Sequence, residues 1–280
     1  MKRLLKWLCA VIVIFGALTV WTLWGNTAPV LTQITVSSTV LPHEFDGFRI
    51  VQISDLHNAG FVGEVAALAA EAQPDIIVFT GDIVDANHTD TGIALKMAEL
   101  AVEIAPCYYV TGNHESWVGE YTELETGLIE LGVIVLHNEK LPVEKNGAEI
   151  LIVGVDDPVF MNDGWEVDDD AALLRPILRS LTAGEDGFVL LLSHRPELFG
   201  LYAETGIELV VSGHVHGGQF RLPLVGGLYG PDQGVFPEYD AGLYTYGATN
   251  MVVSRGIGNS VFPVRFNNRP EVVLIELKAE

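Results

Sequence analysis

The chain contains 280 residues, of which 49% are hydrophobic, so it can bury a substantial core and is not intrinsically disordered. Its 15 basic and 37 acidic residues give a formal net charge of −22, and phosphate backbones repel so acidic a body, which argues against a nucleic-acid scaffold as partner. Only two cysteines are present, Cys9 and Cys107, in two dissimilar segments, which excludes a disulfide framework and a thiolate metal cluster.

Residues 1–28 predict an N-terminal membrane anchor. An uncharged apolar run covers residues 7–24 and, as a helix, would span roughly 27 Å, close to the thickness of the hydrocarbon core of a bilayer. Trp21 and Trp24 at its far end are typical of an interfacial aromatic belt. A cleaved signal peptide, which has a shorter apolar core, and a buried helix of a soluble protein are the alternatives. We expect an uncleaved anchor.

The basic residues of the N-terminus predict its orientation. Lys2, Arg3 and Lys6 precede the apolar run, and the next basic residue is Arg49. By the positive-inside rule the N-terminus stays in the cytoplasm and the rest of the chain is exported. We therefore expect a single-pass protein of the cell membrane, with its acidic body on the extracytoplasmic face.

The rest of the chain predicts a linker or first strand over residues 29–43 and one domain over residues 44–280. Near-continuous apolar runs indicate strands that are buried on both faces; they cover residues 48–54, 75–80, 107–111, 150–155, 188–193, 208–212 and 271–277. Helix-like segments lie between them, at residues 63–73, 92–104, 121–131 and 170–181. This alternation predicts an α/β fold with sheets covered by helices. Residues 217–246, dense in Gly and Pro, predict a long loop.

Polar clusters directly follow five of the predicted strands. They contain Asp55, His57, Asp82, Asn113, His114, His194, His214 and His216. Any one cluster alone is equally typical of a turn or a cap. Ligand sites in α/β sheets form outside the carboxyl ends of strands, so all five should converge on one edge. Imidazole, carboxylate and amide groups without thiolate favour Mn²⁺, Fe or Zn²⁺ over Ca²⁺, and they are numerous enough for two ions.

These clusters resemble, in order, the five signature blocks of calcineurin-like metallophosphoesterases. The blocks are Asp55-x-His57, Gly81-Asp82-x-x-Asp85, Gly112-Asn113-His114-Glu115, His194 and Gly213-His214-x-His216. The predicted anchor and residues 154–158 and 216–219 resemble the membrane-anchored bacterial branch of that superfamily, and the tail 265–277 is similar too. The resemblance implies a four-layer α/β/β/α sandwich and a phosphoester hydrolase with a dinuclear metal centre.

The resemblance also implies a role for each residue. Asp55, His57 and His216 would bind one metal, Asn113, His194 and His214 the other, and Asp82 would bridge both. His114 would be catalytic, as a proton donor or charge stabiliser at the leaving oxygen. The family usually has Arg after the second Asp of the second block, where this chain has Ala86, so any role of that arginine is in doubt.

Two acidic neighbours, Asp85 and Glu115, are candidates for orienting the imidazoles, with solvated turn residues as the alternative. In the predicted loop, Arg221 and Phe220 are candidate substrate contacts for a lipid phosphoester, with ordinary packing of a buried loop as the alternative.

The expected function is hydrolysis of phosphodiester or pyrophosphate bonds at the membrane surface, of a phosphorylated lipid or glycolipid, with two divalent ions and Mn²⁺ favoured. A nucleotide phosphodiesterase that the anchor merely localises is one alternative. A catalytically silent metal-binding module is another, although a scaffold would not need His114. The sequence leaves the oligomeric state open.

Overall fold

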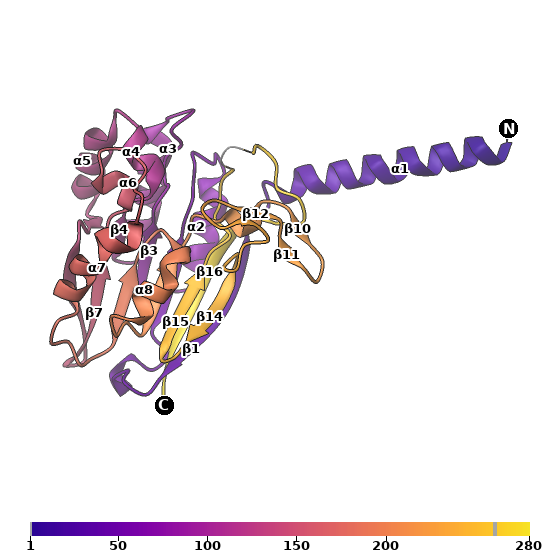
Figure 1. Ribbon diagram of the computed structural model, residues 1–280. Helices are drawn as coiled ribbons and strands as arrows, with labels where there is room; N and C mark the ends of the chain where they lie inside the picture. The colour runs from indigo at the N-terminus through magenta and orange to yellow at the C-terminus, as the bar shows by residue number, and fades with distance from the viewer. Residues whose placement is uncertain (1, 260–261) are drawn as a thin grey trace.

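The computed structural model describes residues 2–259 and 262–280 and contains two six-stranded sheets with helices on their outer faces (Figure 1). In spatial order, the first sheet consists of β1 (Val30–Ser38), β16 (Glu271–Ala279), β2 (Arg49–Ile53), β3 (Ile76–Thr80), β4 (Cys107–Val110) and β5 (Ile134–Val135). The second consists of β14 (Gly242–Tyr246), β15 (Thr249–Val253), β9 (Leu209–Ser212), β8 (Val189–Leu192), β7 (Ala148–Gly154) and β6 (Glu139–Lys145).

Helices form the outer layers. The first sheet is covered by α2 (Val62–Glu71), α3 (Thr91–Val102) and α5 (Tyr121–Leu131), and the second by α7 (Asp170–Leu181) and α8 (Phe199–Ala203). Two short helices, α4 (Asn113–Trp117) and α6 (Pro158–Met161), follow β4 and β7. Single 3₁₀ turns occur at His43–Phe45, Pro196–Leu198 and His216–Gly218.

Side chains that alternate along the central strands build the layers. On β2, Ile50 packs into the cluster between the two sheets, whereas Val51 packs against the outer helices. Successive side chains of a strand point to opposite faces, so a strand buried on both faces must be apolar throughout. This is why the runs predicted from the sequence are nearly continuous, and the four-layer α/β/β/α sandwich is confirmed.

The segment 29–43, expected to be a linker or a first strand, contains β1. This strand pairs in parallel with β16 along its whole length, from Val30 beside Glu271 to Ser38 beside Ala279. The sheet therefore begins immediately after the N-terminal helix. The domain boundary at residue 44 stays a prediction.

The segment 217–246 differs from the long loop that its glycines and prolines predict. It forms two short hairpins, β10 (Arg221–Leu222) with β11 (Gly226–Gly227) and β12 (Tyr229–Gly230) with β13 (Gly234–Val235), and then enters the second sheet as β14. Two-residue strands between turns have too few residues to show alternation, which is why the sequence pattern hides them.

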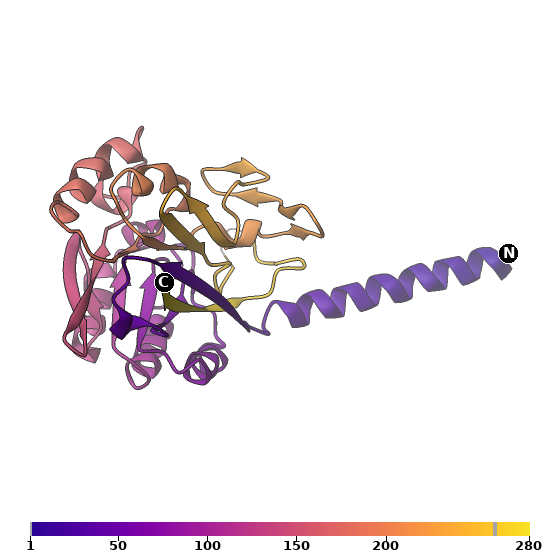
Figure 2. The same cartoon turned by 90° about the horizontal axis from the view of Figure 1, so that it is seen from below.

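Helix α1 (Lys2–Gly25) projects from the body and is long and apolar enough to cross a membrane, with none of its residues buried (Figure 1 and Figure 2). Its end is joined to the body by specific contacts. The amide of Asn26 donates to the carbonyl of Arg265 at 2.8 Å and accepts from its backbone N–H at 2.7 Å. The ring of Trp21 stacks edge-on against Phe266, with centroids 5.9 Å apart, and the guanidinium of Arg269 lies 4.7 Å from the ring centroid of Trp24.

The parallel strands set the position of the site. In the first sheet β2, β3 and β4 run in parallel, and in the second β7, β8 and β9 do. The polar clusters follow β2, β3, β4, β8 and β9, so they come from the carboxyl ends of strands in both sheets.

The close packing of the sheets beside this edge generates a testable prediction. A Cβ atom at Gly154, the last residue of β7, would lie 2.4 Å from Cβ of Leu136 and 2.9 Å from Cγ1 of Val110. We expect Gly154→Ala to destabilise the fold by about 1–3 kcal/mol through overpacking. Urea unfolding in detergent measures this, with Gly187→Ala, which meets open space, as control. Equal stability of both variants would contradict the packing described.

Candidate metal centre

The structure gathers all eight residues of the predicted clusters at one edge of the two sheets. They are Asp55, His57, Asp82, Asn113, His114, His194, His214 and His216, and all are buried. Residues 55 and 216 are far apart in sequence but adjacent here, because the strands that precede them end at the same edge. Burying carboxylates and imidazoles so close together costs free energy unless they pair with one another or with a bound ion.

One group of donor atoms forms around the ring of His57. Its Nε2 lies 3.1 Å from Nε2 of His216 and 3.4 Å from Oδ2 of Asp82. Oδ1 of Asp55 lies 3.6 Å from Nε2 of His216. These four side chains present two imidazole nitrogens and two carboxylate oxygens to a common point, which is a donor set that a divalent cation can occupy.

A second group shares one atom with the first. Nε2 of His194 lies 3.1 Å from Nδ1 of His214 and 3.3 Å from Oδ2 of Asp82, the oxygen that also faces His57. Asn113 is buried at the start of α4, and its Oδ1 has no hydrogen-bond partner among the described residues. An orphaned buried oxygen is expensive, and a cation would satisfy it. The side chains therefore fit two divalent ions.

Backbone strain concentrates in these residues. Asp55, His57, Asp82, His214 and His216 all have positive φ, between 40° and 72°. Non-glycine residues rarely occupy this left-handed region, and such strain tends to cluster at functional sites. The turns after the strands direct these side chains inward, and the cost is an unfavourable backbone conformation at each of them.

Two glycines of the motifs allow this close approach. A Cβ at Gly112 would lie 2.3 Å from Oδ1 of Asp82, and one at Gly213 would lie 2.5 Å from Oδ2 of Asp55. Side chains at these positions would displace both carboxylates. Steric exclusion thus explains why glycine precedes Asn113 and His214 in the sequence.

Hydrogen bonds fix Asp82. Its Oδ1 accepts from the backbone N–H of His114 at 2.8 Å. Burial opposes its ionisation, but the neighbouring imidazoles, His194 foremost, hold its pKa well below the usual range. Asp82 is therefore an anion between the two groups of donors.

The two candidate orienting carboxylates differ in what they contact. Oδ2 of Asp85 lies 3.4 Å from Nδ1 of His57, which makes no well-formed hydrogen bond within the described part of the chain, and the nearby ring lowers the pKa of Asp85 to about 2. Glu115 instead accepts from the backbone N–H groups of Asp82 at 2.9 Å, Ile83 at 2.8 Å and Gly112 at 2.7 Å. It therefore ties the turn after β3 to the turn after β4, and its described bonds orient backbone instead of an imidazole.

The ring of His114 lies beside His57, with centroids 4.5 Å apart. Its Nδ1 accepts from the backbone N–H of Ala86 at 3.1 Å. An imidazole that accepts at Nδ1 carries its proton on Nε2. Burial lowers the pKa of His114, which agrees with a neutral ring. The backbone of Ala86, where the family usually has Arg, thus sets the tautomer of His114.

Several residues of the site are not apparent from the sequence. Oδ2 of Asp232, in the segment 217–246, lies 2.8 Å from Nε2 of His214. The same oxygen accepts from Arg195 at 2.7 Å, and Arg195 donates in turn to Asp157. Arg195 could have been found from the sequence, because it directly follows the predicted ligand His194. No neighbouring motif in the sequence points to Asp232.

A buried arginine, Arg265, lies beside the donor group that contains His216. Arg265 is 1% exposed, and its Nη2 lies 3.2 Å from Nδ1 of His216. Burial, together with the charges of His57 and Arg265, lowers the pKa of His216 well below its usual value. A neutral imidazole is the form that binds metal.

The two candidate substrate contacts, Phe220 and Arg221, lie outside both donor groups. Nη1 of Arg221 is 3.0 Å from Oδ2 of Asp240 and donates to the carbonyl of Gly217. Phe220 packs between Phe262 and Phe266, with ring centroids 5.9 and 6.4 Å away. Their contact with substrate stays a prediction.

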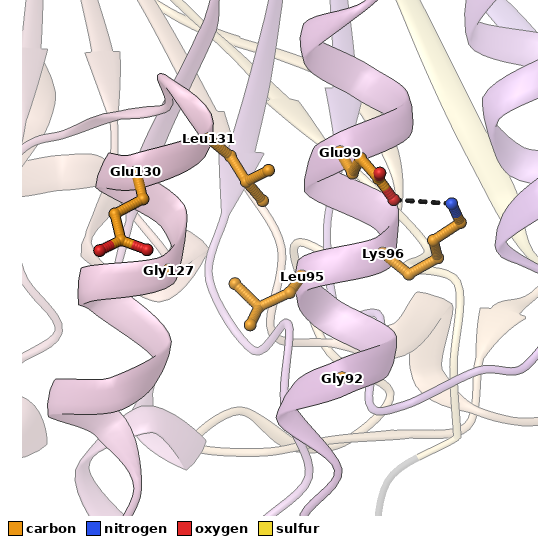
Figure 3. A pocket seen from close by; sticks show the side chains of 7 residues that line it. All are labelled: Gly92, Leu95, Lys96, Glu99, Gly127, Glu130 and Leu131. Atoms are coloured by element: carbon orange, nitrogen blue, oxygen red, sulfur yellow. Dashed lines mark hydrogen bonds and ion pairs between the residues drawn. The ribbon is translucent and has the colours of Figure 1, made fainter.

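One hollow on the body opens beside this centre. A cavity of about 820 Å³ opens beside the metal-binding groups and is lined by His57, Asn58, Asp85 and His88, among others. A groove of about 530 Å³ lies on the outer helical layer instead, between Leu95 and Lys96 of α3 and Gly127 of α5 (Figure 3). Residues of the predicted clusters do not line that groove.

Comparison with known proteins agrees with this geometry. Residues 48–218 match the model of the calcineurin-like phosphoesterase family. An uncharacterized metallophosphoesterase of Bacillus subtilis, YkuE, is 32% identical over 89% of this chain and 85% of its own length. The phosphodiesterase YaeI of Escherichia coli is 31% identical over 82% of each chain.

Two further matches concern the anchor and the fold. A transmembrane protein with metallophosphoesterase domain from Bos taurus is 29% identical over 90% of this chain, which spans 57% of that protein. The crystal structure of TT1561 of Thermus thermophilus matches 75% of this chain and 90% of its own, with a TM-score of 0.53 at 15% identity. The family match covers the segment that supplies every donor atom described above, and the chain belongs to the calcineurin-like metallophosphoesterase family.

Proposed function

We propose that this protein hydrolyses phosphodiester or pyrophosphate bonds at the membrane surface, with a phosphorylated lipid or glycolipid as substrate. Its family makes it a metal-dependent phosphoester hydrolase. The single observation that supports the proposal most is the pair of buried donor groups that share Oδ2 of Asp82. Two adjacent cation sites on one carboxylate suit in-line displacement at phosphorus.

In this proposal six of the predicted ligands belong to one ion each, and Asp82 belongs to both. Asp55, His57 and His216 would hold one divalent ion, Asn113, His194 and His214 would hold the other, and Asp82 would contact both. The imidazole, carboxylate and amide donors suit Mn²⁺, Fe or Zn²⁺, and Mn²⁺ is the ion we propose. When bound, two such ions would supply an acidified water and positive charge beside the phosphoryl oxygens.

The protein's own side chains supply the remaining chemistry. His114 presents its Nε2–H, because Nδ1 is occupied by the Ala86 amide. It donates to the leaving oxygen and stabilises the charge that develops as the P–O bond breaks. Asp85 and Asp232 orient the rings of His57 and His214.

The proposed attachment of the protein to a membrane favours a membrane-bound substrate over a soluble one. The apolar helix α1 and the match to a transmembrane protein indicate a membrane protein. We place its N-terminus in the cytoplasm and its body on the extracytoplasmic face, because Lys2, Arg3 and Lys6 precede the span. A tethered site meets lipid head groups at high effective concentration. The hairpins β10–β13, which carry Phe220 and Arg221, lie on the side of the body from which α1 leaves (Figure 1 and Figure 2).

The first prediction of this proposal concerns Asp82. We expect Asp82→Asn to lose metal from both sites and to lower the rate at least about a hundredfold, because a neutral amide cannot bridge two cations. Metal content of the purified protein is the measurement, with circular dichroism to show that the fold persists. Asp163→Asn, at an exposed aspartate that also has positive φ, is the matched control. If Asp82→Asn kept a metal-to-protein ratio of about two, the bridging role would be contradicted.

The second prediction separates the two ions. Among the predicted ligands, Asp232 contacts the ring of His214, and its other contact is Arg195. We therefore expect Asp232→Asn to lower the affinity of one ion roughly tenfold to a hundredfold while the other is retained. Calorimetric titration of the metal-stripped protein with Mn²⁺ resolves the two events. Equal weakening of both events would show that Asp232 acts on the fold as a whole.

The third prediction tests His114. We expect His114→Ala to keep both metals but to lose rate, most strongly for diesters with poor leaving groups, because these depend on stabilisation of the leaving oxygen. A series of aryl phosphodiesters with graded leaving groups, with His43→Ala as control, measures the dependence. The same loss for good and poor leaving groups would exclude this role.

A further inference from the structure

A second, smaller cavity connects the metal centre with the end of α1. It has a volume of about 350 Å³, and its walls include Leu23 from the last turn of α1, Phe61, Ile257 and Val264 from the body, and the predicted ligand His57. We refer to it as the membrane-side cavity. The side chain of His57 thus borders both this cavity and the 820 Å³ cavity described above, which we refer to as the polar cavity.

Two amide side chains in the wall of the membrane-side cavity are bonded within the protein. The amide of Asn26 donates to Thr22 and Arg265 and accepts from Arg265. The amide of Asn259 donates to the carbonyl of Pro263 at 3.2 Å. The other side chains of the wall are mainly apolar, and they include Ala59, Phe61, Ile257 and Val264.

The polar cavity has more polar side chains in its wall, although His57, Asn259 and Pro263 line both cavities. Asn58, Asp85, Asn87 and His88 line it, and Oδ1 of Asn58 has no hydrogen-bond partner among the described residues. Such a wall suits a ligand group that carries hydroxyl or amine donors. The two cavities meet at His57, at the edge of the metal centre, where a bound phosphorus would lie.

We propose that the membrane-side cavity binds an apolar ester arm, so that the substrate is a phosphodiester that joins an apolar alcohol to a polar one. The apolar arm lies against Leu23 and Val264, and the polar arm lies in the polar cavity. This inference rests on the proposed function and deepens it, because it assigns a side of the site to each half of the substrate.

The end of α1 sets the level of this cavity relative to a bilayer. Trp21 and Trp24, typical of the membrane interface, lie in the last turns of α1, and Leu23 lies between them. An apolar chain that follows α1 therefore meets Leu23 in the wall of the cavity that His57 also borders. A soluble nucleotide has no group for this path.

The geometry also assigns the bond that breaks. His114 is hydrogen-bonded to Ala86, whose neighbours Asp85 and Asn87 line the polar cavity. The P–O bond to the polar alcohol breaks as the oxygen of water bonds to phosphorus. The leaving oxygen takes up one proton, which balances the proton that the water gives up. The products are the free polar alcohol and a phosphomonoester on the apolar arm.

Two synthetic diesters test the subsite: 4-nitrophenyl decyl phosphate and 4-nitrophenyl methyl phosphate, hydrolysed by the full chain in detergent with Mn²⁺. Both release the same leaving group, so the chemical step is matched. We expect kcat/KM to be at least about tenfold higher for the decyl ester, which burial of roughly two methylene groups is enough to give. Equal kcat/KM for the two esters would overturn the subsite alone, whereas no hydrolysis of either would overturn the proposed function and the subsite with it.

Variants separate the cavity from simple partitioning into detergent. Val264→Trp fills the cavity, and Leu23→Ser makes an exposed wall position polar with little risk to the fold. Both should lower the decyl-to-methyl ratio at least about threefold, corresponding to less than one buried methylene group. Ile129→Ser, at an exposed apolar residue of α5, should leave the ratio unchanged. A ratio that survives both cavity variants would overturn the proposal.

Discussion

The position of one carboxylate, Asp82, is the constraint on which the site depends. Its Oδ2 faces rings from both sheets, His57 from the first and His194 from the second, and its Oδ1 is held by the backbone of His114. The anion is buried, so its hydration must be replaced by imidazoles, amides or cations. The missing side chain of Gly112 and the left-handed backbone of Asp82 itself are what let it reach this place.

The four-layer architecture follows from the same requirement. Two parallel strand sets, each buried on both faces, bring their carboxyl ends to a common edge, and only there can donors from residues 55 and 216 meet. The sheets must then pack closely enough that a carboxylate on one touches a ring on the other. Glycines such as Gly154 mark how little space remains between them.

The sequence predicts the central strands, the longer helices and the cluster of candidate ligands because these have local signals, whereas it predicts neither β6 nor β15. Apolar runs followed by Asp, Asn or His indicate strand ends, and α/β topology then implies convergence. Asp232 and Arg265 escape such reasoning, since each contacts an imidazole that is distant in sequence and lies in a segment without periodicity. Glu115 shows a further limit: its type and place point to an orienting role, but its partners are backbone amides that only the folded turns bring together. β14 was hidden by the Gly- and Pro-rich stretch before it.

The joint between α1 and the body has a mechanical consequence. Asn26 pairs with Arg265, Trp21 stacks on Phe266, and β1 begins five residues after the helix ends, so little slack separates the span from the sheet. A flexible tether would let a catalytic body tumble and sample distances of tens of ångströms. In the anchored arrangement proposed above, a stem this short would hold the candidate metal site at a constant height above the bilayer and facing one way. The search for substrate would then be two-dimensional, with an encounter rate set by lateral diffusion within one leaflet.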